Sequence, residues 1–142
     1  MATAESCTGG MVAAALTEIA GSSDVVEAGL VTYSNQAKTA LLGVPEALIA
    51  RVGAVSDEVA RAMVAGVLAR TAADLAVAVT GIAGPGGATP TKPVGLVFLG
   101  LTRRGGPTRT ERHVFAGERK AIRAAATVRA LELLAEAANG PS

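Results

Sequence analysis

Apolar positions along the chain follow two spacings, which predict where strands and helices lie. Short apolar or β-branched runs predict strands at 25–33, 75–79 and 94–101, and a looser alternation at 108–115 suits an edge strand. Helical periodicity predicts helices at 9–19, 34–42, 45–53 and 118–138, with another that begins at Ser56. Ser34 and Ser56 fit helix N-caps, and Gly43 fits a C-terminal stop.

The predicted strands and helices interleave, so the pattern indicates one α/β domain with helices on the faces of the sheet. The run at 75–79 should be covered on both faces, because it contains no polar position. In the helix that begins at Ser56 an apolar stripe faces the core: Val59, Met63, Val64, Val67 and Leu68. In the last helix the expected inward positions are Ile122, Ala125, Ala126, Leu131 and Leu134.

Composition excludes several classes of function. The chain has 142 residues and a net charge of +1, and its only aromatic residues are Tyr33, Phe98 and Phe115, so neither an electrostatic nor a stacking interface with nucleic acid is indicated. A single cysteine, Cys7, and a single histidine, His113, exclude an intrachain disulfide and argue against a Cys/His metal site. His113 has no visible partner and is expected to be structural or exposed. With no membrane-length apolar run and no signal peptide, the expectation is a soluble cytoplasmic protein.

Residues 4–10, Ala-Glu-Ser-Cys-Thr-Gly-Gly, place polar side chains where an apolar lead-in turns into a helix. Free backbone N–H groups and the positive end of a helix dipole meet at such a corner, which suits an anion or an oxyanion. Ser6 or Cys7 can act there as a nucleophile if a base lies nearby. In the alternative interpretation one hydroxyl caps the helix and Cys7 is a small buried hydrophobe. Glu5 would pair with a cation, act as an acid or remain solvated.

The stretch from Thr80 to Gly87 leaves a buried strand with four glycines and one proline. Glycines allow backbone N–H groups to converge on an anion, so the stretch favours a ligand-binding loop over a merely flexible turn. It is not a Walker A loop and does not match G-x-G-x-x-G.

Two cations are expected near the N-terminal ends of helices, where the helix dipole repels them. Lys38 would lie one turn after Ser34, and Arg119 in the first turn of the last helix. Both placements are explained if the cations face a pocket, where a lowered pKa makes Lys38 a usable base and Arg119 forms a forked phosphate contact. By itself Lys38 is more typical of a solvated lysine, and Tyr33 of a core residue. Arg119 also fits an exposed arginine in a segment that holds Arg123.

Together these stretches resemble the C-terminal domain of the CinA (competence/damage-inducible) family. The similar segments, in order, are 3–10 (TAESCTGG), 31–38 (VTYSNQAK), 42–44 (LGV), 53–56 (GAVS), 80–87 (TGIAGPGG), 92–95 (KPVG) and 115–119 (FAGER). The resemblance implies a single domain over 1–142, a three-layer α/β/α fold with a mixed sheet, and self-association. Stand-alone members look like PncC-type amidohydrolases, which convert nicotinamide mononucleotide (NMN) to nicotinate mononucleotide and ammonia without a metal or cofactor.

The resemblance also implies roles for particular residues. Ser6 would attack the carboxamide carbon, Lys38 would take its proton, and Tyr33 would orient or relay it. Backbone N–H groups after Ser6, or at Thr80 and Gly81, would stabilise the oxyanion. The implied substrate-binding residues are Glu5, Thr8, Gly9, Thr80, Gly81, Ala83, Gly84, Gly86, Gly87 and Arg119. The 5′-phosphate is expected on the glycine loop and Arg119, although the phosphate and nicotinamide sites could be exchanged. Whether Ser6 forms an acyl-enzyme or positions water stays open.

One departure concerns the start of the chain. Members of the family usually carry a helix and a full strand before the Ala-Glu-Ser motif, whereas five residues precede Ser6 here. We therefore expect either a start placed too far downstream or a truncated lead-in. The expected partners are a nucleotide substrate and further copies of the chain, with neither nucleic acid nor membrane. One alternative is a non-catalytic nucleotide- or partner-binding domain linked to competence or DNA damage. Another is a Cys7 thiol hydrolase, which would lack an adjacent histidine base.

Overall fold

A computed structural model describes residues 1–140 and contains one five-stranded sheet. The strands are β1 (Ala2–Glu5), β2 (Ala28–Val31), β3 (Leu75–Gly81), β4 (Leu96–Arg103) and β5 (Thr108–Val114), in the order β2-β1-β3-β4-β5. β1 is parallel to both β2 and β3, whereas β4 is antiparallel to β3 and β5 is antiparallel to β4. The sheet is therefore mixed, as the family resemblance implied.

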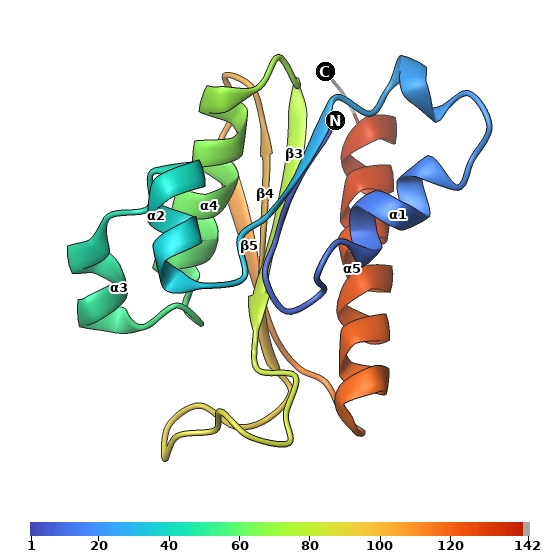
Figure 1. The fold of residues 1–142 in the computed structure, drawn as a ribbon. Coiled ribbons are helices and arrows are strands. Elements are labelled where there is room, and N and C mark those ends of the chain that lie inside the picture. Colours follow the sequence, from blue (N-terminus) through green and yellow to red (C-terminus); the bar gives the residue numbers. More distant parts are fainter. Residues whose placement is uncertain (141–142) are drawn as a thin grey trace.

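Helices cover both faces of this sheet (Figure 1). They are α1 (Met11–Thr17), α2 (Asn35–Leu42), α3 (Glu46–Val52), α4 (Asp57–Arg70) and α5 (Arg119–Asn139), with a short 3-10 turn, η1 (Ser22–Asp24). α2, α3 and α4 lie on one face, and α1 and α5 lie on the other (Figure 1). The arrangement confirms the three-layer α/β/α fold of a single domain. No helix within residues 1–140 is long and apolar enough to cross a membrane.

Two apolar cores fill the spaces between the layers, one on each face of the sheet. Because the side chains of a strand alternate between faces, Val77 and Val79 of β3 pack with Ile122 of α5. Ala76 and Ala78 pack on the opposite face with the stripe of α4. The whole predicted stripe is buried, and β3 is covered on both faces, as its uninterrupted apolar run predicted.

Local signals fixed the helix ends well. Ser34 Oγ accepts the N–H of Ala37 at 3.0 Å and Ser56 Oγ accepts the N–H of Val59 at 3.3 Å, which confirms both N-caps. Gly43 ends α2 with φ 69°. The first helix begins later than predicted because Gly9 and Gly10 have φ values of 60° and 107°, in the left-handed region that a right-handed helix cannot include.

Three sequence predictions need correction. β2 spans only Ala28–Val31 rather than 25–33, because η1 precedes it and because its pairing partner β1 covers only Ala2–Glu5, opposite Ala28–Val31. α5 buries Ile122, Ala126 and Leu134 as expected, but Ala125 and Leu131 are only half-buried, and the prediction missed Ala130 and Leu133. His113, expected to be structural or exposed, has partners that the sequence did not reveal, which fits the structural alternative. Its Nε2 lies 2.8 Å from Glu111 Oε2, and its ring stacks on Phe115.

The connections around β1 determine where a ligand can enter. From β1 the chain passes through α1 to β2 on one side, and it returns through α2, α3 and α4 to β3 on the other side. In sheets with parallel strands, such a reversal opens a crevice at the carboxyl ends of the strands, where ligands bind. Ser6 is the first residue after β1, and the glycine-rich loop follows β3.

Candidate active site

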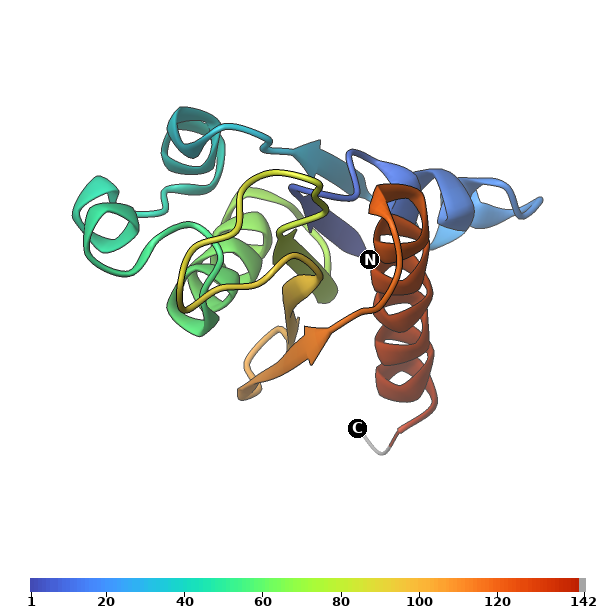
Figure 2. The ribbon, with the colours of Figure 1, turned by 90° about the horizontal axis from the view of Figure 1, so that it is seen from below.

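A pocket of about 300 Å³ lies at the carboxyl ends of β1 and β3. Figure 2 looks onto this end of the sheet, where the glycine-rich loop, the start of α5 and the start of α2 surround the strand ends. The wall is formed by Ser6, Cys7, Tyr33, Asn35, Lys38, Ala54, Val55, Thr80, Gly81, Ile82, Ala83, Gly84, Gly86, Gly87 and Arg119. Ten of the thirteen residues predicted for the site are in this wall; Glu5, Thr8 and Gly9 are not.

A serine and a lysine meet at the base of the pocket. Lys38, on the first turns of α2, is only 1% exposed, and its Nζ lies 3.0 Å from the Oγ of Ser6. The same Nζ donates to the backbone carbonyls of Thr32, at 2.9 Å, and of Tyr33, at 3.3 Å. Burial lowers the pKa of Lys38 from its ordinary value of 10.5, because the low-dielectric interior disfavours the charged form. The interpretation of Lys38 as a solvated lysine is therefore wrong.

Tyr33 and Arg119 form the opposite wall. Tyr33 is 60% exposed, and its hydroxyl accepts a hydrogen bond from Arg119 Nη2 at 3.0 Å. Arg119 Nη1 donates to Gly84 O at 2.8 Å, so this guanidinium links α5, Tyr33 and the glycine-rich loop. The interpretation of Tyr33 as a core residue is wrong, because the strand that precedes it lies at the edge of the sheet.

The glycine-rich loop closes the pocket from the side of β3. Thr80 Oγ1 donates to Ala54 O at 2.9 Å, which ties the loop between α3 and α4 to the end of β3. Gly84 and Gly87 have φ values of 78° and 91°, so the loop uses glycine where other residues would be strained. Sequence reasoning did not assign Ala54 to the pocket, although the similar segment at 53–56 marked this loop.

Glu5 lies beneath the pocket and anchors α1. It is fully buried, and its carboxylate accepts the backbone N–H groups of Val12, at 2.9 Å, and Ala13, at 3.1 Å. It also accepts the Thr8 hydroxyl at 2.7 Å. Gly9 is exposed and faces Arg123 rather than the pocket. None of these three predicted substrate contacts lies in the wall, because the short helix after β1 uses Glu5 as its cap.

Cys7 follows Ser6 but has a different chemical environment. Its side chain is 5% exposed, and burial raises the pKa of its thiol to about 11, against the opposing effects of its own backbone N–H, Arg123 and Lys38. A protonated thiol is a poor nucleophile at neutral pH, so Ser6 is the better candidate.

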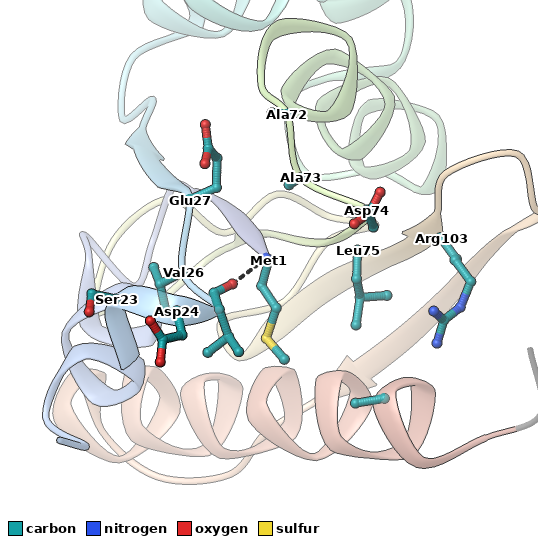
Figure 3. Close-up of a pocket in the computed structure, with 12 residues that line it drawn as sticks. Met1, Ser23, Asp24, Val26, Glu27, Ala72, Ala73, Asp74, Leu75 and Arg103 are labelled. Atoms are coloured by element: carbon teal, nitrogen blue, oxygen red, sulfur yellow. Dashed lines mark hydrogen bonds between the residues drawn. The ribbon is translucent and has the colours of Figure 1, made fainter. Parts of the chain in front are cut away.

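A second hollow, of about 420 Å³, lies at the other end of the sheet (Figure 3). Met1, Asp24, Glu27, Asp74 and Arg103 contribute to its wall, and the amino group of Met1 donates to the carbonyl of Val25 at 2.5 Å. Its described lining residues include no lysine beside a serine or cysteine. Within residues 1–140 no group of three or more His, Cys, Asp or Glu side chains is arranged to hold a metal ion.

Comparison with known proteins gives one consistent family. The profile described as the CinA C-terminal domain matches residues 1–138. A CinA-like protein of Akkermansia muciniphila is 54% identical over 136 residues, which cover 96% of this chain. The chain spans only 33% of that protein. The nicotinamide-nucleotide amidohydrolase PncC of Pseudomonas putida is 53% identical over 130 residues, which cover 92% of this chain and 81% of that protein.

Solved structures match over the same range. The competence/damage inducible protein CihA of Agrobacterium tumefaciens is 51% identical with a TM-score of 0.92, over 94% of this chain and 82% of that one. The competence damage-inducible protein A of Klebsiella pneumoniae is 40% identical with a TM-score of 0.93, over 99% and 87% of the two chains.

Proposed function

The chain belongs to the CinA C-terminal domain family, and we propose that it is an amidohydrolase that converts NMN to nicotinate mononucleotide and ammonia. The observation that carries the proposal is the contact of 3.0 Å between the buried Lys38 Nζ and Ser6 Oγ. The similarity to PncC of Pseudomonas putida, along most of both chains, supports the choice of substrate.

The surroundings of Lys38 suit it to act as a base. A neutral amine has two N–H donors and one lone pair. If the two donors bind the carbonyls of Thr32 and Tyr33, the lone pair is left to face the Ser6 hydroxyl. Burial favours this neutral form, because it disfavours the ammonium. Lysine thus fills the role that histidine has in many serine hydrolases.

The reaction then proceeds in two stages. Ser6 Oγ attacks the carboxamide carbon while Lys38 takes the hydroxyl proton, and the carbonyl electron pair moves onto oxygen. When the oxyanion collapses, Lys38 returns the proton to the departing nitrogen, and ammonia leaves an ester on Ser6. Water attacks that ester, Lys38 takes a proton from the water and returns it to Ser6 Oγ, and nicotinate mononucleotide is released. Direct contact between Lys38 and Ser6 favours this covalent route over one in which Ser6 only positions water.

The remaining wall fits a mononucleotide. We assign the phosphate to Arg119 and the glycine-rich loop, since a guanidinium has five N–H donors and Arg119 uses only two groups, Nη1 and Nη2, for Gly84 and Tyr33. The backbone N–H groups of Cys7 and Gly81, two residues that line the pocket together with Ser6, are our candidates for the oxyanion hole. At about 300 Å³ the pocket is at the small end of the range of volumes for small-molecule sites.

The direct test is ammonia release from NMN by the unmutated chain and by Ser6→Ala, Lys38→Met and Lys120→Met. Loss of a general base lowers rates by roughly 10²–10⁴-fold, and loss of the nucleophile should cost at least as much. Lys120→Met is the matched control, because Lys120 is exposed and outside the pocket wall. Undiminished activity in Ser6→Ala and Lys38→Met would refute the assigned roles. NMN binding without turnover by the unmutated chain would instead favour a non-catalytic nucleotide-binding domain.

A further inference from the structure

A second arginine of α5 contacts the turn that carries Ser6. Arg123 lies one helical turn after Arg119, so both side chains leave the same face of α5. Arg123 Nε donates to Cys7 O at 3.0 Å, and its Nη2 donates to Thr8 O at 3.3 Å. Arg123 is half-buried and is not among the residues that line the pocket, so we assign it no direct contact with the substrate.

Other hydrogen bonds also constrain the turn: Ser6 N–H donates to Val79 O at 2.9 Å, and the Thr8 hydroxyl donates to Glu5 at 2.7 Å. Within it, Gly9 N–H bonds to Ser6 O at 2.9 Å and Met11 N–H bonds to Thr8 O at 3.1 Å. Gly9 and Gly10 both have positive φ, and residues without a side chain restrict the backbone least. The carbonyls of Cys7 and Thr8 belong to the two peptide groups on either side of Thr8. A guanidinium that holds both of them therefore fixes the orientation of two successive peptide planes.

We propose that Arg123 is a positioning residue for the amidohydrolase reaction, which it serves by fixing the peptide groups that follow Ser6. With these groups held, Ser6 Oγ keeps its contact with Lys38, and the backbone after Ser6, which includes the Cys7 N–H proposed for the oxyanion hole, keeps its position. Glu5 holds the same turn from the opposite side through Thr8 and α1. The inference rests on the proposed function, because it assigns Arg123 to the step that Ser6 performs. The positive charge of Arg123 also reaches the turn, where it opposes the rise in the pKa of Cys7 caused by burial.

A purely structural role would make Arg123 one of several links between α5 and the rest of the fold. Arg129, on the same helix, provides the comparison. Its Nε and Nη2 both donate to Glu111 of β5, at 2.9 Å and 2.8 Å, far along the chain from the Ser6 turn. Arg123→Met and Arg129→Met thus remove the same group from the same helix, but only the first loosens the turn.

The experiment measures kcat and KM for NMN deamidation, the free energy of unfolding, and amide hydrogen exchange in Arg123→Met, Arg123→Lys and Arg129→Met. We expect Arg123→Met to lower kcat by about 10- to 100-fold with KM changed little, since small displacements of reacting groups cost rates of this order. Arg123→Lys should recover part of the loss, because an ammonium can hold one of the two carbonyls. Arg129→Met should lose stability but keep kcat within about twofold, as expected for a site remote from the chemistry.

Hydrogen exchange separates this inference from the proposed function. We expect the amides of Gly9 and Met11 to exchange faster in Arg123→Met and to be unchanged in Arg129→Met. Exchange in Arg123→Met equal to that of the unmutated chain would overturn the inference, whether or not NMN is the substrate. The inference would also be overturned if kcat fell in both Arg123→Met and Arg129→Met, in the same proportion to their loss of stability. Absence of ammonia release by the unmutated chain would refute the proposed function, and exchange would then decide the role of Arg123 by itself.

Discussion

Replacing Glu5 by glutamine tests the interpretation of this buried carboxylate as the cap of α1. The two carboxylate oxygens accept four donors, among them the backbone N–H groups of Val12 and Ala13. Glutamine offers one oxygen and one NH2 group, and in either orientation the NH2 faces an N–H donor. One backbone N–H of the first turn of α1 is then left without an acceptor in a buried site.

The expected loss follows from these contacts. A buried donor left unsatisfied costs about 1–3 kcal/mol, and hydrogen bonds that lose a charged partner weaken by about 1 kcal/mol. The favourable interaction of the carboxylate with the helix dipole, about 0.3–1 kcal/mol, is lost as well. We expect Glu5→Gln to lower the free energy of unfolding by about 3 kcal/mol, which corresponds to a fall in Tm of about 6–12 °C for a domain of this size.

Urea unfolding, followed by circular dichroism, measures the change, and thermal unfolding measures Tm. Glu18→Gln is the matched control. The substitution makes the same chemical change, but Glu18 is exposed at the other end of α1 and has no buried contact to lose. Its effect should stay within about 0.5 kcal/mol. If Glu5→Gln costs no more than Glu18→Gln, the reasoning about the cap is wrong.

Three further predictions concern the site and the packing beside it. The rate of ammonia release should rise with pH through the pKa of Lys38, which burial places below 10.5, because only the neutral amine accepts the Ser6 proton. Lys38→Arg should be inactive at every pH, since a guanidinium keeps its proton. Cys7→Ser should keep its activity within about threefold. Iodoacetamide should alkylate native Cys7 slowly at neutral pH, because burial raises the pKa of the thiol to about 11. If iodoacetamide inactivated the protein as fast as it alkylates a free cysteine, this prediction would be contradicted. Gly66→Ala should destabilise the fold by about 2 kcal/mol or more in urea unfolding, because a Cβ there would collide with the carbonyl oxygen of Leu42, and an unchanged midpoint would refute the close contact of α2 with α4.

The sequence predicted the parts of the fold that depend on neighbouring residues. Ser34 and Ser56 cap helices within one turn of themselves, so their signals are local and were confirmed. The buried run of β3 and the looser alternation of β5 also follow from short stretches of chain. The predicted start of α1 was too early. Glycine also occurs within helices, so the sequence does not show that Gly9 and Gly10 precede the helix; their positive φ values do.

The sequence identified most of the residues that line the pocket, but it did not reveal their contacts. Lys38 lies 32 positions after Ser6, and its burial depends on how α2 packs against the end of β1, which spacing along the chain does not reveal. Glu5 was assigned to the substrate, because a carboxylate next to a candidate nucleophile gives no sign that it will cap a helix seven residues later. Arg123 could have been suspected from its place four residues after Arg119, which puts the two on one helix face.

The two arginines of α5 contact segments that lie far from them in the sequence: Arg123 holds the Ser6 turn, and Arg119 holds Tyr33. Arg123 follows Cys7 by 116 positions, and Arg119 follows Tyr33 by 86. During synthesis the ribosome makes the Ser6 turn well before it makes α5. Contacts so distant in sequence form only after α5 has been synthesised and has docked, so until then the Ser6 turn lacks its bonds to Arg123. The proposed amidohydrolase site is therefore assembled only once α5 has been made.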